Sequence, residues 1–236
     1  MRILRQIFII VCPLTFSGCQ ERMVELHTDL PLAKEDRSQK PRQKSGEPLL
    51  VPEGTKLLSS GAKVTASDDF PIIGELELIT DGNKEKPNYF EYHVELMDGL
   101  QWVQLDIERQ HTICAILVWH YYFPYGEDYY YSGEYDGPRV YQDVVVQISN
   151  DPAFENDVTT VFNNDHDNTS GLGVGGDDTY IETSEGLWIS VEGVQGRYVR
   201  LYSNGYIDLA PKDRNDRSKE KYFASNHYIE VEVYGK

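Results

Sequence analysis

Basic residues are scarce in this sequence of 236 residues. Lys and Arg together number 22 against 39 Asp and Glu, which gives a formal net charge of −17 at pH 7. Phosphate backbones and anionic lipid headgroups are recruited through positive charge, so a surface this acidic repels both of them. The composition therefore argues against nucleic acid as a partner.

Long apolar runs are absent beyond the N-terminus. The run from Ile7 to Phe16 follows Arg2 and Arg5, and it is too short to cross a bilayer as a stable helix. A short apolar run behind a positively charged start is typical of a secretory signal peptide. We therefore predict a signal peptide over residues 1–18.

The residues that follow this run specify how the leader is processed. Ser17-Gly18-Cys19 places small residues directly before a cysteine and resembles a bacterial lipobox, in which Cys19 becomes the lipidated first residue. The alternative is ordinary cleavage near Gly18 with Cys19 incidental. Lipidation predicts a protein anchored to the bacterial cell envelope, at the outer membrane or the cell surface, that touches the membrane only through this lipid.

Cysteine is also rare, with three residues in the chain. Processing removes Cys12 and acylates Cys19, which leaves Cys114 alone inside the apolar stretch Ile113–Val118. No intramolecular disulfide is then available. Cys114 is expected to be a small buried hydrophobic side chain.

Motifs of known catalytic sites are missing. The sequence contains no Gly-x-Ser-x-Gly elbow, no His-Glu-x-x-His helix, no Cys-x-x-Cys pair and no phosphate-binding glycine loop. His166 stands between two Asp residues, but neighbouring side chains of an extended chain point to opposite faces. The sequence therefore predicts a protein that is not an enzyme.

The composition between the leader and residue 53 differs from the rest. Residues 19–52 are polar, rich in proline and without a sustained apolar period in Arg37–Glu47, which predicts a flexible tether. Residues 53–236 are predicted to form one domain, since this length suits a single core.

The expected domain is all-β. Short runs rich in Val, Ile, Tyr and Trp alternate with Gly, Asn and Asp clusters, and helical periodicity is nearly absent. Residues 102–107 and 228–233 alternate as half-buried strands do, whereas 113–119 is apolar on both faces. Further strands are expected at 144–148, 159–162, 188–191 and 198–202. This spacing predicts an antiparallel sandwich or jelly roll.

Five motifs in order resemble a known family. They are Ile79–Asn83, Trp102–Asp106, Val144–Ser149, Arg197–Leu201 and Tyr228–Gly235. Together they resemble the discoidin, or coagulation factor V/VIII type C, domains, which include the family 32 carbohydrate-binding modules. The resemblance covers roughly residues 60–235 and implies a galactose-binding-like jelly-roll β-sandwich that binds carbohydrate.

The resemblance also implies a structural calcium ion. In bacterial members the ion lies where an early Asp-Gly turn meets the last strand, and Asp81, Asn83 and Glu230 stand at the matching positions. An Asp, a Glu and several turn carbonyls suit the oxygen ligands that calcium prefers. The alternative is that Asp81-Gly82-Asn83 is only a turn and Glu230 faces solvent.

Ligands of this family bind on loops at one end of the sandwich, where an aromatic ring meets the sugar. Eight of the 17 tyrosines lie between Trp119 and Gln142. The candidate ligand-binding residues are His120, Tyr121, Tyr122, Arg139, Asp143, Asn204, Tyr206, Asn226 and His227. The tyrosine-rich segment could equally be a loop that packs on itself and shields the core. Turn chemistry alone would also explain Asn204-Gly205.

Two other possibilities stay open. The same aromatic segment could recruit a protein partner, which makes a protein-interaction or structural envelope module the alternative function, and an enzyme of unrecognised type is the further alternative. The run Asn163–Gly176 places Asp165 and Asp167 in alternation, as calcium loops do, but it lacks the spacing of an EF-hand. An irregular polar loop with local Asn and Asp hydrogen bonds is the favoured interpretation there.

Overall fold

A computed structural model describes residues 21–28, 49–84, 93–122, 139–209 and 221–236. The secondary structure of these residues is β1 (Met23–Glu25), β2 (Leu50–Pro52), β3 (Lys56–Leu57), β4 (Lys63–Ala66), the 3-10 helix η1 (Leu76–Thr80), β5 (Val94–Leu96), β6 (Leu100–His120), β7 (Arg139–Tyr141), β8 (Val145–Ser149), β9 (Thr159–Asn163), β10 (Leu187–Asn204), β11 (Tyr206–Asp208), β12 (Lys221–Phe223) and β13 (Asn226–Gly235).

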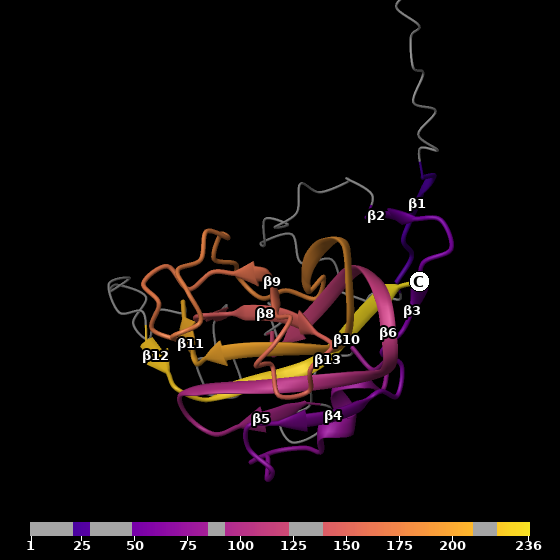
Figure 1. Cartoon of the computed structure of the whole chain (residues 1–236). Coiled ribbons are helices and arrows are strands. Elements are labelled where there is room, and N and C mark those ends of the chain that lie inside the picture. Colours follow the sequence, from indigo (N-terminus) through magenta and orange to yellow (C-terminus); the bar gives the residue numbers. More distant parts are fainter. Residues whose placement is uncertain (1–20, 29–48, 85–92, 123–138, 210–220) are drawn as a thin grey trace, which may run out of the picture.

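The strands pair antiparallel throughout (Figure 1). The largest sheet has the order β3-β13-β6-β10-β8-β9, with β4 paired to β6 and β5 paired to β13. A three-stranded sheet, β12-β11-β7, stands at one end. The prediction of an all-β antiparallel sandwich is confirmed.

Two strands are longer than the sequence pattern indicated. β6 contains both predicted strands, 102–107 and 113–119, and bends at Glu108, whose φ is +69°. β10 likewise joins 188–191 to 198–202 across two register shifts against β6. A strand that bends at an irregular register can contribute to both layers of a sandwich. The alternation in the sequence predicted the two halves of each strand separately. It did not predict that the halves form one continuous strand.

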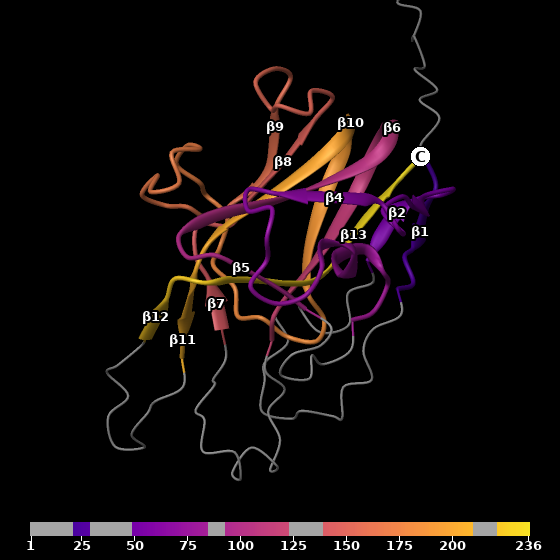
Figure 2. The same ribbon diagram turned by 90° about the horizontal axis from the view of Figure 1, so that it is seen from below.

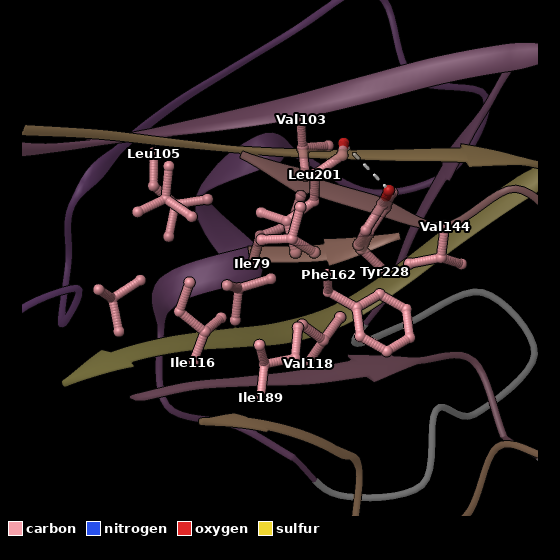
Figure 3. Packing of buried hydrophobic residues seen from close by; sticks show 14 of the residues in the cluster. Ile79, Val103, Leu105, Ile116, Val118, Val144, Phe162, Ile189, Leu201 and Tyr228 are labelled. Carbon is pink, nitrogen blue, oxygen red and sulfur yellow. Dashed lines mark hydrogen bonds between the residues drawn. The ribbon is translucent and has the colours of Figure 1, made fainter. Parts of the chain in front are cut away.

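The main core lies between the layers (Figure 3). Val103, Leu105 and Ile107 of β6 are buried on the face that the alternation predicted. They pack with Leu201 and with Tyr228, whose hydroxyl donates to the Leu201 carbonyl at 3.4 Å. The β-branched and leucine side chains of the strands therefore form one continuous apolar cluster.

A second apolar cluster covers the outer face of β6 and β13. It contains Val51, Ala115, Leu117, Trp119, Tyr122, Ile229 and Tyr234, with Val24, Leu26, Leu49 and Trp188 packed against it. Its existence explains why β13 is buried at every residue, although the pattern at 228–233 predicted a half-buried strand. The residues that cover the second face of β13 come from the N-terminal part of the chain.

The N-terminal residues 21–28 belong to this folded unit. Met23 pairs with Pro52 and Glu25 pairs with Leu50, so β1 and β2 form a small sheet. Val24 and Leu26 reach the second cluster. Residues 21–28 and 49–52, which the composition assigned to a tether, are therefore structured and packed, whereas residues 29–48 lie outside the described part of the chain.

Trp119 is the centre of the second cluster. Its side chain is fully buried, and its indole N–H donates to the Ser184 carbonyl at 3.0 Å. Gly186, with a φ of +69°, lies against the ring, and a Cβ at this position would come within 2.7 Å of it. The absence of a side chain at Gly186 therefore lets the backbone lie directly on the indole.

Truncation of Trp119 should strongly destabilise the fold. We expect Trp119→Ala to lower the free energy of unfolding by about 3–5 kcal/mol, because it leaves a large cavity and removes the indole hydrogen bond. Urea denaturation followed by circular dichroism measures this. Val174→Ala, at a side chain that is 72% exposed, is the matched control and should stay within about 0.5 kcal/mol of the parent.

Cys114 is buried, as the apolar stretch around it predicted. Among the residues that the structure describes, no helix has the length and apolar character needed to cross a membrane.

Candidate functional site

One end of the sandwich gathers polar and aromatic side chains from five elements. β7, β11 and β12 stand together at this end, and β13 begins there, while the C-terminus lies at the opposite end (Figure 2). Tyr206 pairs with Tyr141 and with Phe223 in the three-stranded sheet. The strand ends thus bring residues from distant parts of the sequence to one place.

We name these residues the histidine-tyrosine cluster. It consists of His93, His120, Tyr121, Arg139, Tyr141, Tyr206 and His227. The His120 ring stacks on Tyr141 with centroids 4.4 Å apart, and the His93 ring meets Tyr121 edge-on at 5.0 Å. Such pairs hold flat faces in fixed orientations.

Arg139 lies at the centre of this cluster. Its guanidinium lies 4.3 Å from the ring centroid of Tyr121 and 4.2 Å from that of Tyr206. A guanidinium between two aromatic faces is held by cation–π attraction. The two rings therefore fix the position of the buried guanidinium, which also forms a hydrogen bond with Tyr141.

His120 is fixed by a carboxylate. Its Nδ1 lies 2.9 Å from Glu182 Oε1, and both side chains are fully buried. A carboxylate at Nδ1 favours the tautomer that carries the proton there, which leaves Nε2 as an acceptor. Within the described part of the chain, His120 Nε2, Glu182 Oε2 and His227 Nδ1 have no hydrogen-bond partner.

His227 is neutral in this setting. Burial lowers its pKa well below 6.5, and the charges of Arg139, His93 and His120 lower it further. Its Nε2 lies 3.7 Å from Glu95 Oε1, but a neutral imidazole makes no ion pair there. Burial raises the pKa of Glu95, while Arg139 opposes that rise. His227 therefore offers uncharged hydrogen-bonding atoms at neutral pH.

The state of His227 predicts a pH dependence of stability. Because its folded pKa is depressed, its contribution is present above pH 6.5 and is lost as the pH falls below that value, where the unfolded chain takes up the proton. We expect His227→Gln to reduce the slope of unfolding free energy against pH in this acidic window. The reduction should correspond to at most about one proton fewer taken up on unfolding. Denaturation series at several pH values measure the slope. The exposed His166 provides the control, and an unchanged slope in His227→Gln would contradict the assignment.

Two of the predicted ligand residues have other roles. Tyr122 points to the outer face and packs in the second apolar cluster, because successive residues of an extended chain alternate between faces. Asn226 is fully buried: its Oδ1 accepts from Ser203 Oγ and Gly205 N, and its Nδ2 donates to the Gly99 carbonyl. A side chain with these bonds holds the turns together and has little capacity left for a ligand.

Asp143 and Asn204 bind each other beside the cluster. Asn204 Nδ2 donates to Asp143 Oδ2 at 2.8 Å, and the same oxygen accepts from Thr169 Oγ1. Asp143 has a φ of +50°, so the chain turns sharply directly after β7. The structure thus brings His120, Tyr121, Arg139, Tyr206 and His227 into one cluster and places Asp143 and Asn204 next to it.

Sequence reasoning missed several members of the site. His93 and Tyr141 were not selected, and Tyr180 and Glu182, which contact His120 Nδ1 at 3.0 and 2.9 Å, are about 60 residues away from it. The Glu182 N–H donates to the Arg139 carbonyl, which joins this segment to β7. The remaining tyrosines of the segment between Trp119 and Gln142, from Tyr125 to Tyr135, lie outside the described residues.

The predicted calcium ligands meet at one corner. The Gly82 N–H donates to Glu230 Oε2 at 3.0 Å, which brings the Asp81-Gly82 turn to the last strand as the resemblance implied. Burial raises the pKa of Glu230 to about 9, and the charges of Glu232 and Asp81 contribute to that rise. A buried carboxylate with a second carboxylate nearby fits a hard cation.

A lysine stands beside this corner. Lys84 Nζ lies 2.6 Å from Glu232 Oε1, and both side chains are buried. The same ammonium contacts Thr28 Oγ1 and lies 5.0 Å from the Trp119 ring centroid. Lys84 therefore compensates Glu232, whereas Glu230 has the Gly82 N–H as its hydrogen-bond donor.

The Asn163–Gly176 run forms a hydrogen-bonded polar loop. Asp165 is buried and accepts from the backbone N–H groups of Thr169 and Ser170. Burial raises its pKa, but the bonds from Ser170 and Thr169 outweigh this and lower it overall. Ligand atoms of Asp143, Asp165 and Asp167 lie within 4.8 Å of one another. The bonds to Asp165 indicate that local bonding shapes the loop, as the sequence favoured.

Comparison with known proteins points to one group of structures. No protein-family model matches the sequence, and no curated protein matches it. The chain is similar in fold to carbohydrate-binding modules of family 32.

Three solved structures illustrate the similarity. Truncated AlyQ with CBM32 and alginate lyase domains has 18% identity and a TM-score of 0.46 over 77% of this chain, which spans about a third (34%) of that protein. The CBM32 of AlyQ in complex with 4,5-unsaturated mannuronic acid has 17% identity and a TM-score of 0.42, covering 72% of this chain and 92% of that one. Chitosan-binding module 1 from a Paenibacillus sp. IK-5 chitosanase/glucanase has 17% identity and a TM-score of 0.44, covering 76% and 99%.

Proposed function

We propose that this chain is a non-catalytic carbohydrate-binding module whose ligand site is the histidine-tyrosine cluster. The observation that carries the proposal is the meeting of flat aromatic faces with buried polar atoms that lack partners within the described residues, among them His120 Nε2 and His227 Nδ1. Buried polar atoms are nearly always hydrogen-bonded, so atoms left unpaired are suited to water or a polar ligand.

The chemistry of the cluster suits sugar hydroxyls. Tyr121 and Tyr206 enclose the Arg139 guanidinium, and neutral His227 beside them can accept and donate hydrogen bonds. Sugars combine a flat apolar face with hydroxyl groups, and aromatic rings beside directional polar groups match both features. The net charge of −17 favours neutral or cationic glycans over polyanionic ones.

A glycan and polysaccharide array screened with the mature chain tests the proposal. We expect saturable, reversible binding to a subset of glycans. Binding to no glycan in the panel would sink the proposal and direct attention to a protein partner, the alternative function.

The non-catalytic part of the proposal rests on what surrounds His120. His120 and Glu182 form a pair that could act as a base, but the described residues place no hydroxyl or thiol within hydrogen-bonding distance of His120 Nε2. A base without a positioned nucleophile lacks half of a hydrolytic site. Turnover of any array-positive glycan, lost in His120→Ala, would contradict this part.

We further propose a structural calcium ion held by Asp81 and Glu230, with Asn83 and turn carbonyls as further ligands. The buried Glu230 carboxylate and the nearby charge of Asp81 support this proposal. The ion would neutralise both carboxylates and fix the turn to β13.

Lipidation of Cys19, after removal of residues 1–18, is also proposed, with attachment to the bacterial cell envelope. Cys19 lies outside the described residues, and the support is the small-residue motif that precedes it. Mass spectrometry of the mature protein should find an acylated N-terminal cysteine. A protein that stays membrane-bound as Cys19→Ala, with no acyl chain in the parent, would refute the anchor.

A further inference from the structure

The chain is bound to the domain almost immediately after Cys19. Glu21 forms an ion pair with Lys236, and Arg22 forms one with Glu53 at 3.2 Å. The Glu53 N–H donates to the Arg22 carbonyl at 2.8 Å. Two residues of extended chain reach at most about 7 Å, which limits how far from Glu21 a lipid on Cys19 could be attached.

The attachment is a strand of the fold, not a tether. β1 pairs with β2, Val24 and Leu26 pack in the second apolar cluster, and Thr28 Oγ1 donates to Glu232 Oε2 at 2.8 Å. These contacts oppose any pull that would draw residues 21–28 out of the domain. A lipid on Cys19 would therefore hold the domain itself at the bilayer.

The proposed ligand site lies at the other end of the molecule. β13 runs from His227, in the histidine-tyrosine cluster, to Gly235, next to Lys236 (Figure 2). Eight residues of antiparallel strand extend about 27 Å. The anchor and the cluster therefore lie at opposite ends of β13, most of the length of the domain apart.

The surface at the anchor end suits a lipid interface. Lys56 pairs with Gly235, and Arg109 Nε contacts His111, whose Nδ1 lies 3.1 Å from the Lys236 carbonyl. Exposed apolar side chains accompany them: Met23 and Leu50 at 49% and Leu57 at 40%. Glu21 and Glu53 compensate the charges of Lys236 and Arg22 at this end, so the exposed apolar side chains are what favours contact with lipid there.

We infer that the end of the sandwich carrying β1, β3 and Lys236 lies against the lipid surface, so that the histidine-tyrosine cluster faces away from the membrane. This inference rests on the lipid anchor proposed above. It gives the module a fixed orientation, with its ligand site directed outward, without any spacer.

Fluorescence quenching in vesicles tests the orientation. In full-length acylated protein carrying Cys114→Ala, a bimane label is placed at Glu192→Cys, near the anchor end, or at Asp98→Cys, near the cluster. Both positions are exposed. Vesicles contain phosphatidylethanolamine, phosphatidylglycerol and a nitroxide-headgroup lipid. We expect quenching several-fold stronger at position 192 than at position 98.

A second variant tests whether the orientation depends on the attachment of β1 to the domain. Val24→Asp with Leu26→Asp should release β1, and the first strand that holds the chain is then β2, about 30 residues after the anchor. Quenching at the two positions should become equal. Equal quenching in the acylated parent would overturn the inference. A missing acyl chain in mass spectrometry would instead refute the anchor, and the two failures are therefore distinguishable.

Discussion

Arg139→Lys should weaken glycan binding at least tenfold. The substitution keeps the positive charge but removes the planar guanidinium that lies between Tyr121 and Tyr206. A lost charge-assisted hydrogen bond corresponds to about 1.5–3 kcal/mol, or a tenfold to hundredfold lower affinity. Isothermal titration with the best array-positive glycan measures the change.

The chain offers a closely matched control. Arg200 also lies between two rings, 4.3 Å from the centroid of Trp102 and 4.1 Å from that of Phe154, but it is on β10 and outside the cluster. Arg200→Lys should therefore bind glycan as the parent does. Circular dichroism must show both variants folded, and equal affinities for the two variants would remove Arg139 from the site.

Glu230→Gln should stabilise the protein when calcium is absent. The pKa of Glu230 is raised to about 9, so its favourable contribution is present below pH 4.5 and is lost as the pH rises toward 9. At pH 7 a neutral amide of the same shape should gain about 1–3 kcal/mol in unfolding free energy. It also keeps an oxygen to accept the Gly82 N–H. Thermal denaturation in chelator measures the gain.

Glu232→Gln is the contrasting variant two residues away. Glu232 pairs with buried Lys84 at 2.6 Å, so its neutralisation leaves a buried ammonium without its carboxylate. The expected loss is about 3–5 kcal/mol. Opposite signs for the two substitutions would support the separate roles of the two carboxylates, and equal signs would contradict them.

Calcium addition extends the same experiment. The parent should gain thermal stability with added calcium, because an ion bound only by the folded state shifts the equilibrium by mass action. Glu230→Gln should lose this gain. A calcium response that persists in Glu230→Gln would place the ion elsewhere, with Asp143, Asp165 and Asp167 as the next residues to substitute.

Residues of the cluster that lie close together in the sequence could be predicted, and those that lie far apart could not. The sequence selected His120 and Tyr121, which the structure places in the histidine-tyrosine cluster, because they end a strongly apolar strand beside a tyrosine-rich segment. Glu182 carries no local signal, and it reaches His120 only because its N–H bonds to the Arg139 carbonyl of β7. Tyr122 was assigned to the site although strand alternation already turns it to the opposite face.

The sequence by itself determined the β class and the buried faces of β6, because period-two alternation and turn residues are local properties, whereas the meeting of Asp81-Gly82 with Glu230 was expected only from the family resemblance. Only the tertiary structure decided that residues 21–28 pack on β13, that Asn226 holds turns, and that His93, His120 and His227 come together with tyrosine rings in one cluster. These features depend on contacts between residues far apart in the chain. No local pattern encodes such contacts, since they arise when the sheets close and bury both faces of β13.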